Sequence, residues 1–175
     1  MNQQDIFSVI KKRRSVRSFL AEDIPTDHIE KFKEALQWAP SAGNRQPWHF
    51  YFILDSTLKN KLVDAAWGQS FIAQAPLVCV VCANPEQSAV RYGSRGRNLY
   101  AIQDTAAAVQ NLMLLAWSLG YGSCWVGAFD EESVRAVLNL NVHLRPVAIV
   151  PVGKAAVLPE PPPRFPLKNI ITVLD

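Results

Sequence analysis

The pattern of apolar and polar positions predicts one long buried helix at residues 103–119. In QDTAAAVQNLMLLAWSL, apolar side chains recur at helical spacing on one face, and further apolar residues cover the other faces. Asp104 suits the N-terminus of a helix, no charge follows it, and Gly120 suits the end. A helix that is apolar nearly all round lies inside a domain or in a membrane. Gln110 and Asn111 interrupt this segment, which is shorter than the ~20 apolar residues a bilayer requires, so we expect it at the centre of a soluble domain.

Helix and strand patterns follow one another irregularly along the rest of the chain. Periodicity and capping residues predict helices at residues 6–12, 25–39, 56–67 and 130–138, with one further turn at 69–75. Runs of aromatic and β-branched residues predict strands at residues 48–54, 76–83, 123–129, 144–153 and 169–175. Because this order has no regular strand–helix–strand repeat, we expect a single α+β domain over residues 1–175.

Four segments allow more specific predictions. The strand at 76–83 is apolar throughout, so both of its faces are expected to be covered. The strand at 144–153 contains two prolines, which indicate a sheet edge or a bulge. Residues 84–100 are polar and basic without periodicity, so we expect an irregular connection there. Residues 155–166 contain five prolines and are expected to form an extended arm.

Composition narrows the class of protein. The 175 residues are 49% hydrophobic and 19% charged, which is ordinary for a globular domain, and the formal net charge is +3. So mild a charge does not by itself demand a nucleic-acid or membrane partner. The N-terminus lacks a basic segment followed by a long apolar run, and three cysteines are too few for a disulfide framework. We therefore expect a cytoplasmic protein with reduced thiols.

Several common chemical motifs are absent. The sequence has neither G-x-G-x-x-G nor a P-loop, so a Rossmann dinucleotide site and a Walker-type NTPase are not expected. Cys79 and Cys82 have CxxC spacing but lie in a strand pattern, where residues i and i+3 point to opposite faces. We interpret them as buried apolar side chains rather than a redox or zinc pair. The three histidines have no ligand-like spacing, and no metal site is expected.

Two segments carry polar groups that suit an anionic, flat ligand. In KKRRSVR, an extended backbone places Arg13, Ser15 and Arg17 on one side, where two guanidiniums and a hydroxyl suit a phosphate. The alternative is a solvated basic face. In PSAGNRQPW, small residues allow close backbone approach, and Asn44 and Gln46 supply donors and acceptors. The alternative there is a plain connection between a helix and a strand.

These segments belong to a series of blocks that resembles a known family. RRSVRSF, APSAGNRQPWHFYFI, QDTAAAVQNLMLLAWSLGYGSCWVGAF, VPVG and PPPRFPL occur in the order found in the nitroreductase family of FMN-dependent enzymes. The resemblance implies a mixed, mostly antiparallel sheet, with helices around a buried central helix, in an intertwined homodimer. It implies two FMN sites at the subunit interface. It also implies that residues 155–175 form an arm whose final strand reaches the partner's sheet.

The resemblance also assigns the FMN contacts. From one subunit, the phosphate and ribityl chain would be held by Arg13, Arg14, Ser15 and Arg17, the last also near the pyrimidine edge, and by Arg164. The other subunit would supply Pro40, Ser41, Ala42, Asn44 and Gln46. Gln69 would hydrogen-bond the flavin ring, and the backbone of Gly127 and Ala128 would approach it near N5.

Two positions depart from the family's pattern. Pro162 stands where many members have a phosphate-binding Lys, and Val126 stands where some have a Glu beside the flavin ring. Lys154 is a candidate to compensate for the missing Lys. These differences affect phosphate affinity and tuning of the ring, while the FMN prediction itself stands.

The resemblance implies a reaction carried by the cofactor. Hydride from NAD(P)H would pass through flavin N5 to an electrophilic acceptor such as a nitroaromatic or quinone, in a ping-pong cycle. An Arg near N1 and O2 would stabilise the reduced flavin, and no catalytic side chain is assigned. One alternative is a specialised flavin enzyme of the same fold, either a dehydrogenase or a flavin-processing enzyme. Others are a cofactor-free interaction protein, or a nucleic-acid-binding protein that uses the basic N-terminal segment and RYGSRGR.

Overall fold

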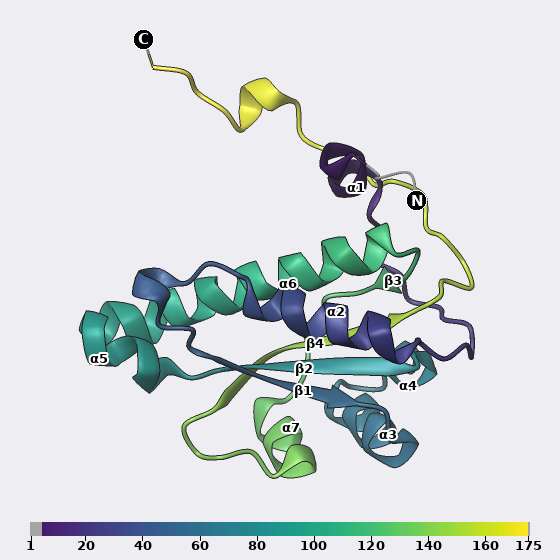
Figure 1. Cartoon of the computed structure of the whole chain (residues 1–175), viewed down its shortest axis with the longest axis horizontal. Coiled ribbons are helices and arrows are strands. Elements are labelled where there is room, and N and C mark those ends of the chain that lie inside the picture. Colours follow the sequence, from purple (N-terminus) through teal and green to yellow (C-terminus); the bar gives the residue numbers. More distant parts are fainter. Residues whose placement is uncertain (1–4, 175) are drawn as a thin grey trace.

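A four-stranded sheet between two layers of helices forms the body of the molecule (Figure 1). The computed structural model describes residues 5–174. The strands are β1 (Trp48–Ile53), β2 (Leu77–Ala83), β3 (Gly122–Ser123) and β4 (Arg145–Gly153), in the order β1-β2-β4-β3 with antiparallel pairing throughout. An isolated parallel bridge joins Ser15 to Ser123, so the pairing is mixed and mostly antiparallel, as predicted.

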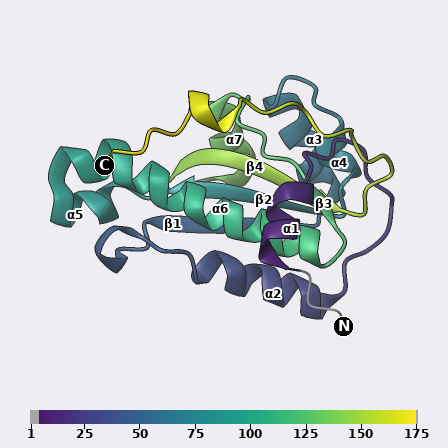
Figure 2. The same cartoon turned by 90° about the horizontal axis from the view of Figure 1, so that it is seen from above.

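The helices divide between the two faces of the sheet. One face is covered by α2 (Thr26–Gln37) and α6 (Ala101–Ser118), and the other by α3 (Ser56–Ala65), α4 (Phe71–Gln74) and α7 (Glu131–Leu138). The helix α1 (Ile6–Lys12) packs on α6 (Figure 2). Within residues 5–174, no helix combines the length and apolar character needed to cross a membrane.

Strand β2 confirms the prediction of a strand covered on both faces. All seven of its residues are buried. Cys79 packs with α2 and α6 in one cluster of the core, whereas Cys82 packs with α3 and α7 in the other. Because successive side chains of a strand point to opposite faces, the CxxC spacing separates the two thiols rather than joining them.

Strand β4 was expected to be an edge strand or to contain a bulge, because of its two prolines, and it contains a bulge. It lies between β2 and β3, so the expectation of an edge strand was wrong over the residues that β3 covers. The register between β2 and β4 shifts where Val81 pairs with Ala148 and Cys82 pairs with Pro146. This bulge leaves Val147 without a partner residue on β2, which accommodates a proline that has no amide hydrogen to donate.

The expectation of an irregular connection at residues 84–100 was wrong. The segment forms α5 (Pro85–Arg95) and a π-helical turn, η2 (Gly96–Tyr100), which continues into α6. Asn84 caps α5 by accepting a hydrogen bond from the amide of Gln87, and a proline occupies the first turn. Gly93 interrupts the helix at φ 54° and ψ −138°, a conformation that essentially only glycine adopts. Polar composition and this break hide the helical period from the sequence.

Helix α6 is buried on one side only within the single chain. Its buried positions include Ala108, Leu112 and Ala116, which face the sheet. Leu114, Leu115 and Trp117 remain partly exposed. The predicted central helix is therefore confirmed in type and place, while its outer apolar face still has surface available for a partner.

The C-terminal arm runs as an extended, exposed segment (yellow in Figure 1). Its only regular element among the described residues is the 3₁₀ turn η3 (Leu167–Asn169), and residues 171–174 form no strand. The predicted strand at 169–175 is thus wrong for this chain on its own as far as residue 174. Asp175 lies outside the described residues. The predicted strand at 123–129 is reduced to β3 and a single bridge between Val126 and Ile149.

Candidate functional site

A cluster of arginines lines a cavity of about 300 Å³ where α1 meets the C-terminal arm. The lining residues are Arg13, Arg14, Ser15, Arg17, Pro159, Glu160, Pro162 and Arg164. The structure therefore brings together all five of the residues predicted to hold a phosphate from one subunit. Arg164 lies beside this N-terminal cluster in space, although it comes from near the other end of the sequence.

The electrostatics of this cavity suit an anion. Nη1 of Arg13 is buried and has no hydrogen-bond partner. Burial, followed by repulsion from Arg164 and Arg14, lowers the pKa of Arg13. None of the ion pairs found among residues 5–174 involves these arginines. An anion with several oxygens would satisfy the buried donor and relieve the repulsion.

The sequence builds this cavity from a helix end and a short extended segment. Arg14 donates from Nη1 to the carbonyls of Lys11 and Arg13 at 2.8 and 2.9 Å, so part of its function is to cap α1. The amide of Val16 then donates to the carbonyl of Ser123 at 2.9 Å, and the Val16 side chain is fully buried. Since side chains alternate along extended backbone, burial of Val16 directs its two neighbours toward the cavity.

A second group of predicted residues meets at the end of α3. Nε2 of Gln69 donates to the carbonyls of Ala66 at 3.0 Å and Ala128 at 2.8 Å. Gly127 is exposed, and a side chain built there would approach no atom more closely than 3.9 Å, at Nε1 of Trp125. The predicted ring-binding backbone therefore borders open space, and Gln69 holds it through the carbonyl of Ala128.

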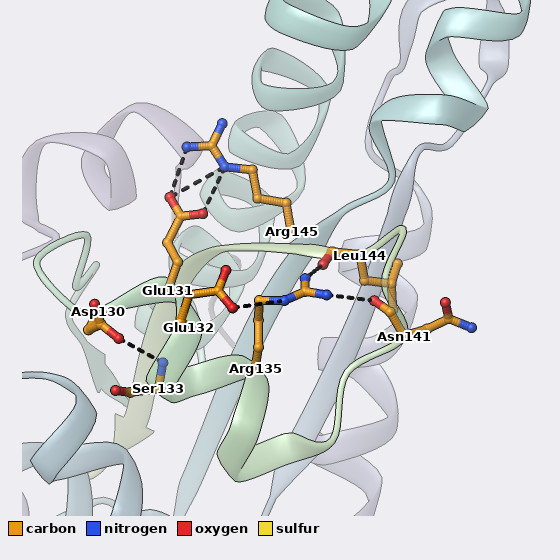
Figure 3. A network of polar contacts seen from close by, with 8 residues as sticks. All are labelled: Asp130, Glu131, Glu132, Ser133, Arg135, Asn141, Leu144 and Arg145. Carbon is orange, nitrogen blue, oxygen red and sulfur yellow. Dashed lines mark hydrogen bonds and ion pairs between the residues drawn. The ribbon is translucent and has the colours of Figure 1, made fainter.

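The start of α7 holds this backbone in place (Figure 3). Asp130 accepts a hydrogen bond from the amide of Ser133 at 2.7 Å, while its own amide donates to the carbonyl of Ala65 at 2.9 Å. Arg145 on β4 pairs with Glu131 at 2.8 Å. These contacts tie the helix that follows Ala128 to both α3 and the sheet.

The third group is the loop at residues 40–47, which is folded by its own side chains and by α6. Oδ1 of Asp104 accepts a hydrogen bond from the amide of Ala42 at 3.1 Å. Oγ of Ser41 accepts from the amide of Gln46 at 2.9 Å. Asn44 and Gln46 have φ values of 53° and 50°, which a residue with a side chain adopts only when its surroundings hold it there.

Helix α5 holds this loop from the other side. Nε2 of Gln87 donates to the carbonyls of Arg45 at 2.7 Å and Gln46 at 3.3 Å. Nε of Arg45 returns a hydrogen bond to the carbonyl of Gln87 at 3.2 Å. Gln87 was not predicted as a supporting residue, because a Gln in a polar segment carries no signal. Asp104 was predicted only as a helix N-terminal residue, although a lone charge in an apolar helix was a usable signal.

The loop lies far from the arginine cluster within one chain. Asp104 is near the start of α6, whereas the Ser15–Ser123 bridge lies beyond the end of α6 at Ser118. The intervening helix spans roughly 20 Å at about 1.5 Å per residue. Figures 1 and 2 likewise place α5 at one end of α6 and α1 at the other. The single chain thus presents two separated halves of the predicted site.

The positions that depart from the family's pattern have clear environments. Nζ of Lys154 lies 4.7 Å from the ring centre of Tyr121 and does not line the arginine cavity. Pro162 does line it. Val126 is buried and pairs with Ile149. Because Lys154 lies on Tyr121 and not in the arginine cavity, the structure gives no support to Lys154 as a replacement for the missing Lys.

Cys79 and Cys82 match the interpretation as buried apolar side chains. Cys79, Cys82 and Cys124 are all buried and unpaired by disulfides. Burial raises the pKa of Cys82 to about 12, and that of Cys79 further still. Thiols held in this form are poor nucleophiles and poor metal ligands. Within residues 5–174 no group of three or more candidate metal ligands occurs.

Comparison with known proteins places the chain in a family. The profile of the Nitroreductase family matches residues 10–70 and 64–154. A protein from Archaeoglobus fulgidus, whose name pairs NADH dehydrogenase with NAD(P)H nitroreductase, is 32% identical over 154 residues, covering 86% of this chain and 85% of its own. An NADH dehydrogenase from Thermus thermophilus is 29% identical and covers 91% of each chain.

Solved structures agree with these sequence matches. A nitroreductase family protein from Clostridium novyi NT has 30% identity and a TM-score of 0.79, with 87% of this chain and 86% of its own covered. A nitroreductase family protein from Streptococcus pneumoniae TIGR4 has 22% identity, a TM-score of 0.88 and coverage of 97% and 100%, which supports the fold alone. The chain belongs to the nitroreductase family, which confirms the resemblance seen in its sequence blocks.

Proposed function

We propose that this protein is a homodimeric, FMN-dependent oxidoreductase that uses NAD(P)H to reduce an electrophilic acceptor such as a nitroaromatic or quinone. The observation that carries the proposal is the arginine cavity, with its buried and unpartnered Arg13 donor. The names of relatives that pair NADH dehydrogenase with NAD(P)H nitroreductase support the electron donor. FMN would supply the hydride chemistry, accepting at N5 from the nicotinamide and delivering to the acceptor.

The chain's own residues would bind and orient the cofactor. Arg13 and Arg164 would hold the phosphate, with Ser15 as a further donor. Arg17, on the same side of the extended segment as Ser15, would place positive charge near N1 and O2 of the ring. Arg14 would contribute less directly, because two of its hydrogen bonds already cap α1.

The ring would lie against the exposed backbone of Gly127 and Ala128. Nε2 of Gln69 holds the carbonyl of Ala128, and Oε1 of the same side chain would accept a hydrogen bond from the ring. The absence of a Cβ at Gly127 leaves room for close approach of a flat ligand. No side chain is assigned a proton transfer, because Asp130, the carboxylate that follows this backbone, already caps α7.

A second copy would complete the site. Pro40, Ser41, Ala42, Asn44 and Gln46 belong to a loop at the opposite end of α6 from the arginines, so we assign them to the partner's cofactor. The partly exposed outer face of α6 supplies apolar surface for such an association. The arm at residues 155–175 would extend over the partner in the same assembly. A cytoplasmic location is part of this proposal.

The absorption spectrum of the purified protein tests the proposal directly. We expect a flavin spectrum, close to one FMN per chain after release by heat and identification by mass, and bleaching on addition of NADH or NADPH. Steady-state turnover with a quinone would separate a reductase from a dehydrogenase or flavin-processing enzyme of the same fold. A colourless protein that also fails to take up added FMN would contradict the proposal.

A nucleic-acid-binding function has less support. Of the three arginines in RYGSRGR, Arg97 is already paired with Glu86 at 2.7 Å. A large negative dependence of DNA or RNA affinity on salt concentration would favour that function.

A further inference from the structure

The segment RYGSRGR lies where α5 bends at Gly93 and continues into η2, beside the 40–47 loop. The break at Gly93 turns the chain back, so that the ring of Tyr100 meets that of Tyr92 edge-on, with centres 5.2 Å apart. The hairpin closes tightly at Gly96, where a Cβ would lie 2.6 Å from the carbonyl oxygen of Ser88. The turn requires glycine at Gly93 and the close contact requires glycine at Gly96, so the backbone itself sets this arrangement.

Two arginines lie on these rings without an acidic partner. The guanidinium of Arg91 lies 5.5 Å from the ring centre of Tyr92, and that of Arg95 lies 5.3 Å from the ring centre of Tyr100. Nε of Arg95 also donates to the hydroxyl of Tyr100 at 2.9 Å. Neither guanidinium takes part in an ion pair among residues 5–174. We call Arg91, Tyr92, Arg95 and Tyr100 the Arg–Tyr patch.

The third arginine of the segment provides an internal comparison. Nε and Nη2 of Arg97 donate to the two carboxylate oxygens of Glu86 at 2.8 and 2.7 Å. Its charge is therefore neutralised, although its side chain is exposed, as those of Arg91 and Arg95 are. The chain pairs one arginine of the segment with a carboxylate and leaves the other two free on aromatic rings.

The Arg–Tyr patch contacts the loop assigned to the flavin. A Cβ built on Gly43 would clash with the hydroxyl of Tyr92 and would lie 3.1 Å from Nη1 of Arg91. Gly43 also has φ 54°, so the loop needs glycine there for both its backbone and this contact. A ligand on the patch would thus lie next to residues that contact the partner's cofactor in the proposed dimer.

We propose that the Arg–Tyr patch binds a planar ring that carries an anionic group, and that the phosphorylated adenosine half of NADPH is this ligand. Guanidinium planes and tyrosine rings offer stacking surfaces, and the free N–H groups of the two arginines bind phosphate in bidentate fashion. A nitroaromatic acceptor with a carboxylate has the same chemistry. This inference rests on the proposed function, because it uses the flavin site to explain why the ligand binds there.

The test uses a double variant, Arg91→Gln with Arg95→Gln, and the matched control Arg97→Gln. Calorimetric titration with 2′,5′-ADP measures the patch without any turnover. We expect the double variant to lose about tenfold or more in 2′,5′-ADP affinity, and to raise KM for NADPH by a similar factor while KM for NADH changes little. The control is expected to retain the parent's values in each measurement.

Further measurements distinguish NADPH from an anionic acceptor as the ligand, and failure of this inference from failure of the proposed function. An unchanged 2′,5′-ADP affinity together with a raised KM for 4-nitrobenzoate, but not for nitrobenzene, would keep the patch and identify the acceptor as its ligand. Unchanged values for all of these ligands, or equal losses in the control, would overturn the inference. Flavin content is read separately from the absorption spectrum. A protein that fails to take up added FMN but binds 2′,5′-ADP through the two arginines would refute the proposed function and retain the patch.

Discussion

Arg13 is expected to lower the stability of the flavin-free protein and to raise its affinity for FMN. Burial and the repulsion of two neighbouring arginines lower the pKa of Arg13, so its charge is costly in the absence of an anion. The variant Arg13→Gln removes that cost, and the free energy of unfolding of the flavin-free protein should rise. The same variant should weaken FMN binding by about tenfold to a hundredfold, the value of a charge-assisted hydrogen bond. Chemical denaturation and fluorescence titration measure the two effects.

Riboflavin, which lacks the phosphate of FMN, tests whether Arg13 acts on the phosphate. The affinity for riboflavin should be similar in Arg13→Gln and the parent. Lys33→Gln, which breaks the exposed pair between Lys33 and Glu30, should alter neither ligand's affinity. An equal loss for FMN and riboflavin would place Arg13 away from the phosphate and would contradict its assigned role.

Asp104 should make stability depend on pH. Burial raises the pKa of Asp104 above its ordinary value of 3.8, so the folded chain holds this proton more tightly than the unfolded chain. The resulting stability is present at low pH and is lost as the pH rises from 3.8 through the raised pKa. Asp104→Asn keeps an acceptor for the amide of Ala42 and cannot ionise. We expect it to flatten this dependence and to be more stable than the parent at pH 7.

Urea unfolding at a series of pH values measures the difference between these proteins. Asp104→Leu serves as the contrast, since it leaves the amide of Ala42 unpaired and should cost about 1–2 kcal/mol relative to Asp104→Asn. Identical pH profiles for the parent and Asp104→Asn would show that Asp104 does not contribute this dependence.

Helix α5 supports the 40–47 loop. Gln87 holds the carbonyls of two successive loop residues, and the loop includes backbone conformations that isolated residues avoid. Gln87→Ala should therefore speed amide hydrogen exchange in the loop and weaken FMN binding by about tenfold. Val90→Ala is the matched control on the same helix, because Val90 is 78% exposed. Equal exchange rates in all three proteins would contradict a supporting role for α5.

The elements that the sequence predicted are those with a clear apolar pattern. The strand at Leu77–Ala83 is apolar throughout, and the helices at Thr26–Gln37 and Glu131–Leu138 carry apolar residues at helical spacing. Helix α5 shows no such pattern, because it is polar and bends at Gly93. The end of the chain was predicted as a strand from its β-branched residues, but a strand forms only where another strand pairs with it.

The site was predictable to the extent that its chemistry resides in a single segment. Arg13, Ser15 and Arg17 follow from strand alternation in a basic run, and the cavity brings them together. Arg164 joined the prediction only through resemblance to the family, because no local pattern links it to residues so distant in sequence. The support from Gln87 depends on a tertiary contact that no local pattern reports, whereas Asp104 stood out as a lone charge in an apolar helix, although its partner could not be predicted.

A second copy of the chain would account both for the separation of the two halves of the site and for the exposed apolar surface beside α6. The arginine cavity and the 40–47 loop lie at opposite ends of α6, so one chain cannot bring them to one cofactor. Between α1, α2 and α6 lies an open groove of about 700 Å³, lined in part by Ile6, Trp38, Leu114 and Leu115. A second copy packed on this side would cover the groove and supply the missing half of each site.

A charge on this surface should therefore remove the cofactor as well as the dimer. We expect Leu114→Arg to convert a dimer to monomers in light scattering and to lower FMN affinity by at least about tenfold, even though the arginine cavity is untouched. Val142→Arg, at a position that is 87% exposed and outside the groove, should leave both properties unchanged. Circular dichroism checks that the monomer is folded. A folded monomer with the parent's FMN affinity would show that one chain suffices for binding, and the loop's residues would then need another role.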